Sequence, residues 1–131
     1  MRRTGFFECG HEKVQKLYEN QVWGQKSNYV EVPTDCPQRD ERMGYTGDGQ
    51  VFALTGAYNF DTNDFWKNFL RDLELGQLDN SEGYVCATVP QTGPAGIGFV
   101  NMLGWGNAVT ILPELMYWQF GDEKALPQQY E

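Results

Sequence analysis

The amino-acid sequence predicts an all-α fold of about four helices joined by long loops. In four stretches, apolar residues recur at spacings of three and four, which is typical of helices with one buried face. Clusters of Gly, Pro, Asn and Asp separate these stretches and are typical of turns and loops. Paired helices joined by irregular loops are therefore the recurring unit, although no internal sequence repeat is evident.

The first helix is expected at about residues 10–22. Its apolar side chains fall on one stripe, and Trp23-Gly24 should end it. Residues 27–32 alternate loosely between polar and apolar, and we expect extended backbone there before Pro33. The apolar stripe consists of Val14, Leu17, Tyr18 and Val22.

A loop from Pro33 to Asp48 follows, and a second helix should run from there to about Asn59. Gly49 and Gly56 lie inside this helix and each costs about 1 kcal/mol relative to Ala. The two glycines are either tolerated defects or points where another helix approaches closely.

The third helix begins at the run Asp61-Thr62-Asn63-Asp64, which resembles a helix start with acidic residues in its first turn. It should continue to about Leu75, with Gly76 as the C-terminal cap. Its expected buried stripe is Phe65, Trp66, Phe69, Leu70 and Leu73.

The rest of the chain contains a long connection and a fourth helix. Residues 78–104 show little periodicity, and loops of this length are often functional. The fourth helix should start near Asn107 and end at Gly121, and Pro113 should interrupt or kink it unless it lies in the first turns. Residues 122–124 open a further short helical piece.

Length and composition limit the function classes. With 131 residues the chain forms one domain at most, so residues 1–131 are treated as a single segment. The net charge of −8 argues against a nucleic-acid or membrane-surface partner and suits a protein that acts on neutral substrates. No apolar run suggests a signal peptide or a membrane-spanning helix, and the cellular location stays open.

The cysteine and histidine content gives no sign of a metal site or a catalytic pair. Cys9, Cys36 and Cys86 are odd in number and unpatterned in spacing, so neither a disulfide framework nor zinc is expected. Cys36 should pack in the interior, and the lone His11 should lie at a helix start. We expect no metal and no cofactor.

The loop from Pro33 to Asp48 carries the chemistry. It reads PTDCPQRDERMGYTGD and gathers four carboxylates, two arginines and one aromatic ring. Such clusters are in most proteins solvated salt-bridge networks. The same residue types also suit carbohydrate chemistry, because carboxyl groups transfer protons and bind hydroxyls, while aromatic rings cover the apolar side of a sugar.

This run closely resembles the signature of the α-L-rhamnosidases of glycoside hydrolase family 78, in which PTDCPQRDER is followed by Leu or Met and then by GWTGD. The likeness extends over nearly the whole chain, through GFFEC, LYENQVWGQKSNYVEV, GQVFALTGAYNFD, FWKNFLRDL, GWGNAV and FGD. It implies a partial (α/α)6 barrel of the six-hairpin type. The chain would be an N-terminal part of that catalytic domain, without the flanking β-sandwich domains.

The resemblance also implies a mechanism and a set of site residues. Glu41 matches the general acid of an inverting hydrolase, which must keep a raised pKa. The substrate would be a rhamnose-containing glycoside or polysaccharide. The catalytic base would lie outside this chain, so the chain alone should be inactive. The residues that match sugar-binding positions are Asp35, Arg39, Asp40, Tyr45, Asp48, Trp105 and Asn107.

Two positions depart from the family pattern. Tyr45 stands where the family has Trp, and Asn107 stands where it commonly has Asp. These departures favour the alternative that the chain is a non-catalytic carbohydrate-binding or interaction module. A partial barrel would also leave apolar helix faces uncovered, so a third expectation is a homo-oligomer that covers them.

Overall fold

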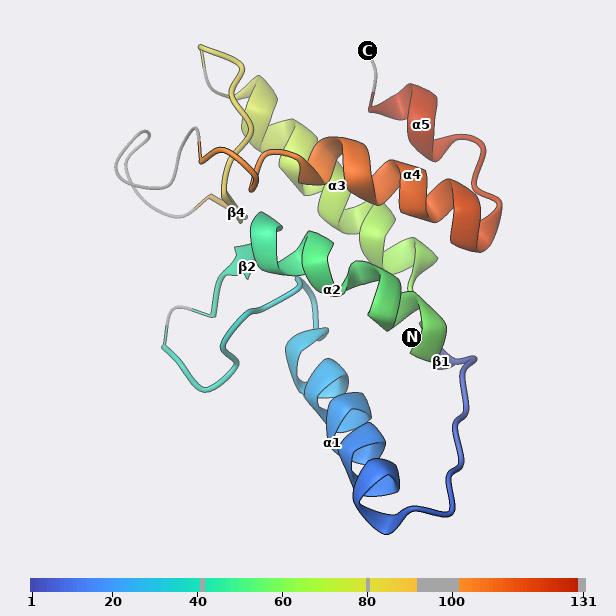
Figure 1. The fold of residues 1–131 in the computed structure, drawn as a ribbon. Coiled ribbons are helices and arrows are strands. Elements are labelled where there is room, and N and C mark those ends of the chain that lie inside the picture. Colours follow the sequence, from blue (N-terminus) through green and yellow to red (C-terminus); the bar gives the residue numbers. More distant parts are fainter. Residues whose placement is uncertain (41, 80, 92–101, 130–131) are drawn as a thin grey trace.

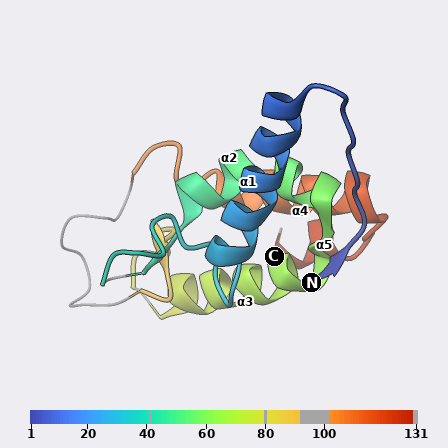
Figure 2. The ribbon, with the colours of Figure 1, turned by 90° about the horizontal axis from the view of Figure 1, so that it is seen from below.

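The computed structural model describes residues 1–40, 42–79, 81–91 and 102–129, and it is mostly helical. Within these residues it contains five helices and four two-residue strands, which confirms the all-α class. The fifth helix is the short helical piece expected after residues 122–124. In Figures 1 and 2, helices α2 (Thr46–Asn59), α3 (Asn63–Leu78) and α4 (Ala108–Phe120) lie together, while α1 (Glu12–Asn28) projects away from them. The short α5 (Ala125–Gln128) follows α4.

Helix α1 is longer than the sequence pattern indicated, and the expected end at Trp23-Gly24 is wrong. Gly24 stays helical, and its carbonyl accepts hydrogen bonds from Ser27 Oγ at 2.9 Å and Asn28 Nδ2 at 2.7 Å. These two bonds support the last turn, so residues 27 and 28 are helical rather than extended. The added turn carries Gln25, which is buried against α2.

Helix α2 meets α1 at a glycine. A Cβ atom on Gly56 would lie 2.9 Å from Gln25 Nε2 and 3.3 Å from the Tyr29 ring. Gln25 Nε2 donates to the Gly56 carbonyl at 3.0 Å, and Asn59 Nδ2 donates to Gln25 Oε1 at 3.1 Å. Gly56 therefore permits close approach and is not a tolerated defect.

Helix α3 starts close to the predicted position but ends later. Gly76 was expected as the C-terminal cap, yet the helix continues to Leu78. A Cβ atom on Gly76 would lie 3.5 Å from Cys86 Sγ, so the residue packs against the following chain. Thr62 occupies the N-cap position without a side-chain capping bond. Four residues of the predicted stripe are buried, namely Trp66, Phe69, Leu70 and Leu73.

Aromatic rings form the centre of the core. The Tyr29 ring stacks on Phe65 with centroids 4.5 Å apart, and it meets Trp66 edge-on at 5.5 Å. Trp66 also contacts Phe69 edge-on at 5.8 Å. Burial raises the pKa of the Tyr29 hydroxyl well above its ordinary value. The end of α1 is thus fixed to α3 by ring contacts.

Helix α4 packs against α2, α3 and α5. It begins after Asn107, and Gly121 ends it with a left-handed φ of 67°, as predicted. Pro113 is buried inside the helix and does not interrupt it. It lies in the second turn of the helix, which is the exception that the prediction from the sequence allowed.

Two short antiparallel strand pairs fix the chain around α2. Strand β1 (Arg2–Arg3) pairs with β3 (Phe60–Asp61), which ties the N-terminal segment to the end of α2. Strand β2 (Gly44–Tyr45) pairs with β4 (Thr88–Val89), directly before α2 begins. Thr46 adds bonds from its N and Oγ1 atoms to the Ala87 carbonyl, at 2.9 and 3.1 Å. The first turn of α2 therefore has a fixed position.

Many large apolar side chains remain on the surface, including Trp23 and Leu17, both 69% exposed. Such patches often bind partners, and self-association of the chain stays a prediction. In the described part of the chain, the helices are too short or too polar to cross a membrane.

Asp122 joins the start of α3 to the connection between α4 and α5. Its Oδ2 atom accepts hydrogen bonds from Lys67 Nζ at 2.7 Å and Asn63 Nδ2 at 3.1 Å. Its Oδ1 atom accepts from the Lys124 backbone N at 3.2 Å. The hydrogen bond from Lys67 is the largest cause that lowers the pKa of Asp122.

We expect Asp122→Asn to lower the free energy of unfolding by about 1–2 kcal/mol at pH 7, because charge-assisted hydrogen bonds are lost. The loss stays this small because Lys67 is partly exposed and solvent weakens its ion pair. A lowered folded-state pKa gives stabilisation that is present above the unfolded pKa and lost as the pH falls through the folded value. The difference in the free energy of unfolding between the parent chain and the variant should therefore shrink below about pH 4. Urea denaturation at pH 7 and pH 3 measures it, and an equal gap at both would contradict the prediction.

Candidate functional site

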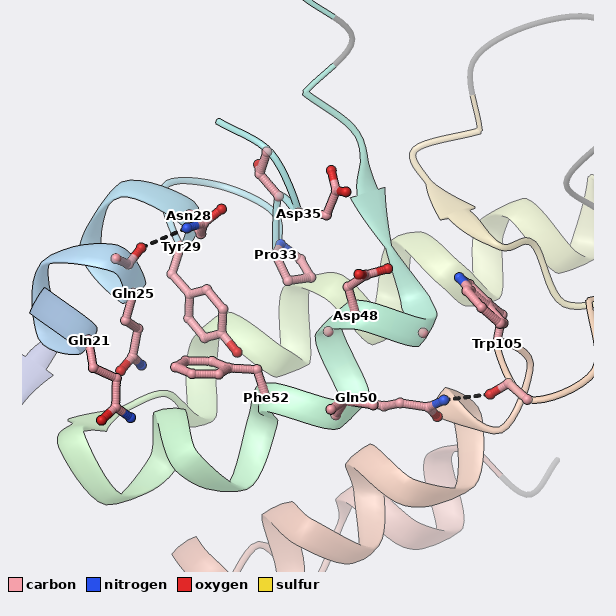
Figure 3. A pocket seen from close by; sticks show the side chains of 16 residues that line it. Gln21, Gln25, Asn28, Tyr29, Pro33, Asp35, Asp48, Gln50, Phe52 and Trp105 are labelled. Carbon is pink, nitrogen blue, oxygen red and sulfur yellow. Dashed lines mark hydrogen bonds between the residues drawn. The ribbon is translucent and has the colours of Figure 1, made fainter. Parts of the chain in front are cut away.

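One cavity of about 650 Å³ lies where α1, the chain after it, the first turns of α2 and the segment before α4 meet (Figure 3). This volume falls in the range of small-molecule sites. The chain around it comes from segments far apart in the sequence. The lining residues are Gln21, Gly24, Gln25, Asn28, Tyr29, Pro33, Thr34, Asp35, Gly47, Asp48, Gly49, Gln50, Val51, Phe52, Gly104 and Trp105.

Three of the residues singled out in the sequence line this cavity together, namely Asp35, Asp48 and Trp105. In Figure 3 the two carboxylates lie on one side of the cavity, with Trp105 beyond Asp48. Two carboxylates and an indole ring in one cavity can accept hydroxyl hydrogen bonds and cover an apolar ring face.

Asp48 stands in the first turn of α2 and is exposed. The positive end of the helix dipole favours a carboxylate there. Gly47 and Gly49 flank it and are both buried, so the neighbouring chain approaches the helix backbone on both sides. The Asp48 side chain thus projects from a fixed backbone.

Asp35 is held by the loop after α1. Cys36 Sγ donates a hydrogen bond to Asp35 Oδ2 at 3.1 Å, and both residues are half-buried. Asp35 Oδ1 is inaccessible and has no hydrogen-bond partner among the described residues. Cys36 was expected to pack in the interior, but it is only half-buried and its thiol contacts Asp35.

Trp105 is half-buried and follows a sharp turn. Gly104 has a φ of +94°, a region that favours glycine. The Gly104 carbonyl accepts a hydrogen bond from Gln50 Nε2, and the Trp105 N atom donates to the Met102 carbonyl at 3.1 Å. The turn that carries the indole is thus bonded to α2.

Four other predicted site residues, all in the described part of the chain, are not among the residues that line the cavity. Arg39 and Asp40 are exposed on the loop, and Tyr45 lies half-buried in β2, paired with Thr88. Asn107 is exposed at the start of α4, where its carbonyl accepts from Thr110 Oγ1 at 2.9 Å. Glu41, the predicted general acid, lies outside the described residues.

Sequence reasoning missed the α1 wall of the cavity. Gln21, Gln25 and Asn28 line it at spacings of four and three, which places them on one face of the helix. This signal was available in the sequence, but the helix was expected to end at residue 22. Gln50 and Phe52 of α2 also line the cavity and were missed. Nothing in the spacing of residues along this helix singles them out.

Ionisable ligands for a metal do not gather in the described residues. There, no group of three or more His, Cys, Asp or Glu side chains could hold a metal ion.

Comparison with protein families identifies one match across the chain. Residues 2–131 match the family model described as the bacterial alpha-L-rhamnosidase 6 hairpin glycosidase domain. An alpha-L-rhamnosidase of Formosa agariphila is 41% identical over 98% of this chain. One of an Alteromonas species is 40% identical over 95% of it. The chain spans only 13% of the length of each of these curated relatives.

Solved structures show the same likeness. The alpha-L-rhamnosidase of Aspergillus terreus matches with a TM-score of 0.88 and 38% identity, covering 99% of this chain and 15% of that one. The Streptomyces avermitilis enzyme, solved as a complex with L-rhamnose, matches with a TM-score of 0.87 and 36% identity. That match covers 97% of this chain and 12% of the other.

Proposed function

The chain belongs to the bacterial α-L-rhamnosidase six-hairpin glycosidase family, and on that premise we propose that it is part of an enzyme that hydrolyses terminal α-L-rhamnosides. The observation that carries this proposal is the shared cavity of Asp35, Asp48 and Trp105. The family resemblance in the sequence implies sugar contacts for these three residues. A relative of the same fold was solved with L-rhamnose, which supports a rhamnose-containing substrate.

The proposed roles follow from the chemistry of each group. The side-chain oxygens of Asp35 and Asp48 accept hydrogen bonds from neighbouring sugar hydroxyls, which selects ring stereochemistry. The Trp105 indole covers the apolar side of the deoxysugar. The remaining predicted substrate contacts do not line the cavity. They would reach a bound sugar only if the sugar or further chain extended the site toward them. These residues are Arg39, Asp40, Tyr45 and Asn107.

The proposed reaction is a single displacement with inversion. Glu41 donates its proton to the glycosidic oxygen as the bond to the anomeric carbon breaks, and a water activated by a second carboxylate attacks the opposite face. Inverting enzymes hold these carboxyl groups about 6.5–9.5 Å apart. No residue of this chain matches the motif of that second carboxylate, so we propose that the base comes from outside it.

A second candidate function is a carbohydrate-binding module without catalysis. The features that favour it are Tyr45 and Asn107, which replace the Trp and Asp of the family pattern. The cavity would then bind the sugar through Asp35, Asp48 and Trp105, and hydrolysis would not follow.

One titration and one assay test these proposals. We expect L-rhamnose to change the tryptophan fluorescence of the pure chain in a saturable way, because Trp105 lines the cavity. We expect no hydrolysis of an aryl α-L-rhamnoside, because the base is missing. Turnover that disappears in Glu41→Gln would contradict the second expectation, and absence of saturable binding in a folded chain would contradict the first.

A further inference from the structure

The position of Trp105 depends on two residues of α2 that have no role in the proposed chemistry. Gln50 bonds the turn before the indole, and Gly47 lies under the ring itself. Both stand within one turn of Asp48 on the same helix. The helix that presents the carboxylate therefore also holds the aromatic wall.

Gln50 acts through its amide nitrogen. The Gly104 carbonyl can only accept, so the Gln50 group that faces it must be the NH₂ donor. The left-handed φ of Gly104 turns the backbone before Trp105. Figure 3 shows this bond reaching from α2 to the Trp105 segment. It is a direct link between α2 and a segment 54 residues further along the chain.

Gly47 acts by having no side chain. A Cβ atom there would lie 2.5 Å from Trp105 Cε2 and 2.6 Å from Nε1, closer than real contacts allow. On the other side of Asp48, a Cβ atom on Gly49 would lie 3.1 Å from Pro33 Cγ. Asp48 thus lies between an indole and a proline ring, and both rings approach positions occupied by glycine (Figure 3).

We propose that Gly47 and Gln50 are positioning residues that hold the Trp105 indole beside Asp48. They thereby set the width of the cavity between the indole and Asp48, where the deoxysugar would bind. The inference rests on the proposed function for the identity of the ligand. The placement of the ring is a property of the sugar-free chain and is measured separately.

The first experiment needs no ligand. In a ¹⁵N-labelled chain, the Trp105 indole N–H resonance is assigned by its loss in Trp105→Phe. Gln50→Met and Gly47→Ala should each shift this resonance and leave the other three indoles in place. Gln77→Met is the matched control, because Gln77 Nε2 donates to the Gly83 carbonyl at 2.7 Å on the exposed α3 side. Gly10→Ala is the second control, since a Cβ atom there meets nothing within 4 Å.

The second experiment measures L-rhamnose affinity. Gln50→Met should weaken binding by about three- to tenfold, the range expected for displacement of a stacked ring. In a Trp105→Ala background the same substitution should change affinity less than about twofold, because the ring it positions is gone. Gln77→Met should leave affinity unchanged in both backgrounds.

The outcomes separate the two proposals. An unmoved Trp105 resonance in Gln50→Met and Gly47→Ala overturns the positioning role. So does a Gln50→Met penalty that persists in the Trp105→Ala background. A shifted resonance in a parent chain that does not bind L-rhamnose leaves the positioning role standing and overturns the proposed function.

Discussion

Replacement of Trp66 by alanine is expected to lower the free energy of unfolding by about 3–5 kcal/mol. Trp66 is fully buried and touches the rings of Tyr29, Phe65 and Phe69. Domains of this size have only about 5–15 kcal/mol of stability in total. The variant should therefore be largely unfolded or close to it, as measured by urea denaturation followed by far-UV circular dichroism.

Two matched substitutions show whether burial causes this effect. Trp118 is 71% exposed, so Trp118→Ala should change stability by less than about 0.5 kcal/mol. Trp66→Phe should cost less than Trp66→Ala, because much of the ring volume stays. It also removes an indole N–H that is buried without a hydrogen-bond partner in the described part of the chain. Equal losses for Trp66→Ala and Trp118→Ala would contradict the prediction.

The core and the cavity share residues, which links stability to the site. Tyr29 belongs to the aromatic core and also lines the cavity. A Cβ atom on Gly49, next to Asp48, would lie 3.7 Å from Trp66 Cη2. The first turn of α2 therefore rests on Trp66, and loss of the core would displace Asp48. Binding assays on core variants need a folding control for this reason.

Local patterns were sufficient to predict helix type and the buried face of α3. The expected stripe of α1 was wrong, because Val14 and Leu17 are exposed and only Val22 of that stripe is buried. The spacing of Trp66, Phe69 and Leu73 predicted the inner face of α3 because a helix repeats every 3.6 residues. Glycines were less informative. Gly24 and Gly76 were expected to end helices, but side-chain bonds to the Gly24 carbonyl and packing of Gly76 against Cys86 keep them helical. Tertiary contacts outweighed the weak propensity.

The site could be predicted only in part, for a similar reason. The family resemblance implied that Asp35 and Asp48 of the motif both bind sugar hydroxyls, and the structure has them lining one cavity. Trp105 joined them through the family resemblance alone, because the Gln50 bond and the Gly47 contact span long sequence distances. The α1 wall with Gln21 and Asn28 was missed, because it depends on where α1 ends.

Asp48→Asn is expected to weaken L-rhamnose binding by about 10- to 100-fold, because a hydrogen bond to a charged group contributes about 1.5–3 kcal/mol. Asp48 is exposed and lines the cavity, so its replacement removes a charged acceptor without opening the core. Asparagine keeps the size of the side chain and one acceptor oxygen. The loss should therefore appear in affinity, measured by fluorescence titration, with little change in the fold.

The same substitution removes a carboxylate from a helix N-terminus, which alone costs about 0.3–1 kcal/mol of stability. Asp64→Asn controls for that effect, because Asp64 is 97% exposed in the first turn of α3 and does not line the cavity. Both variants should lose a similar small amount of stability, whereas only Asp48→Asn should lose affinity. If the two variants bind L-rhamnose equally well, Asp48 does not contact the sugar. If both lose affinity together, the helix dipoles and the net charge of the chain govern binding, and the carboxylate at position 48 does not.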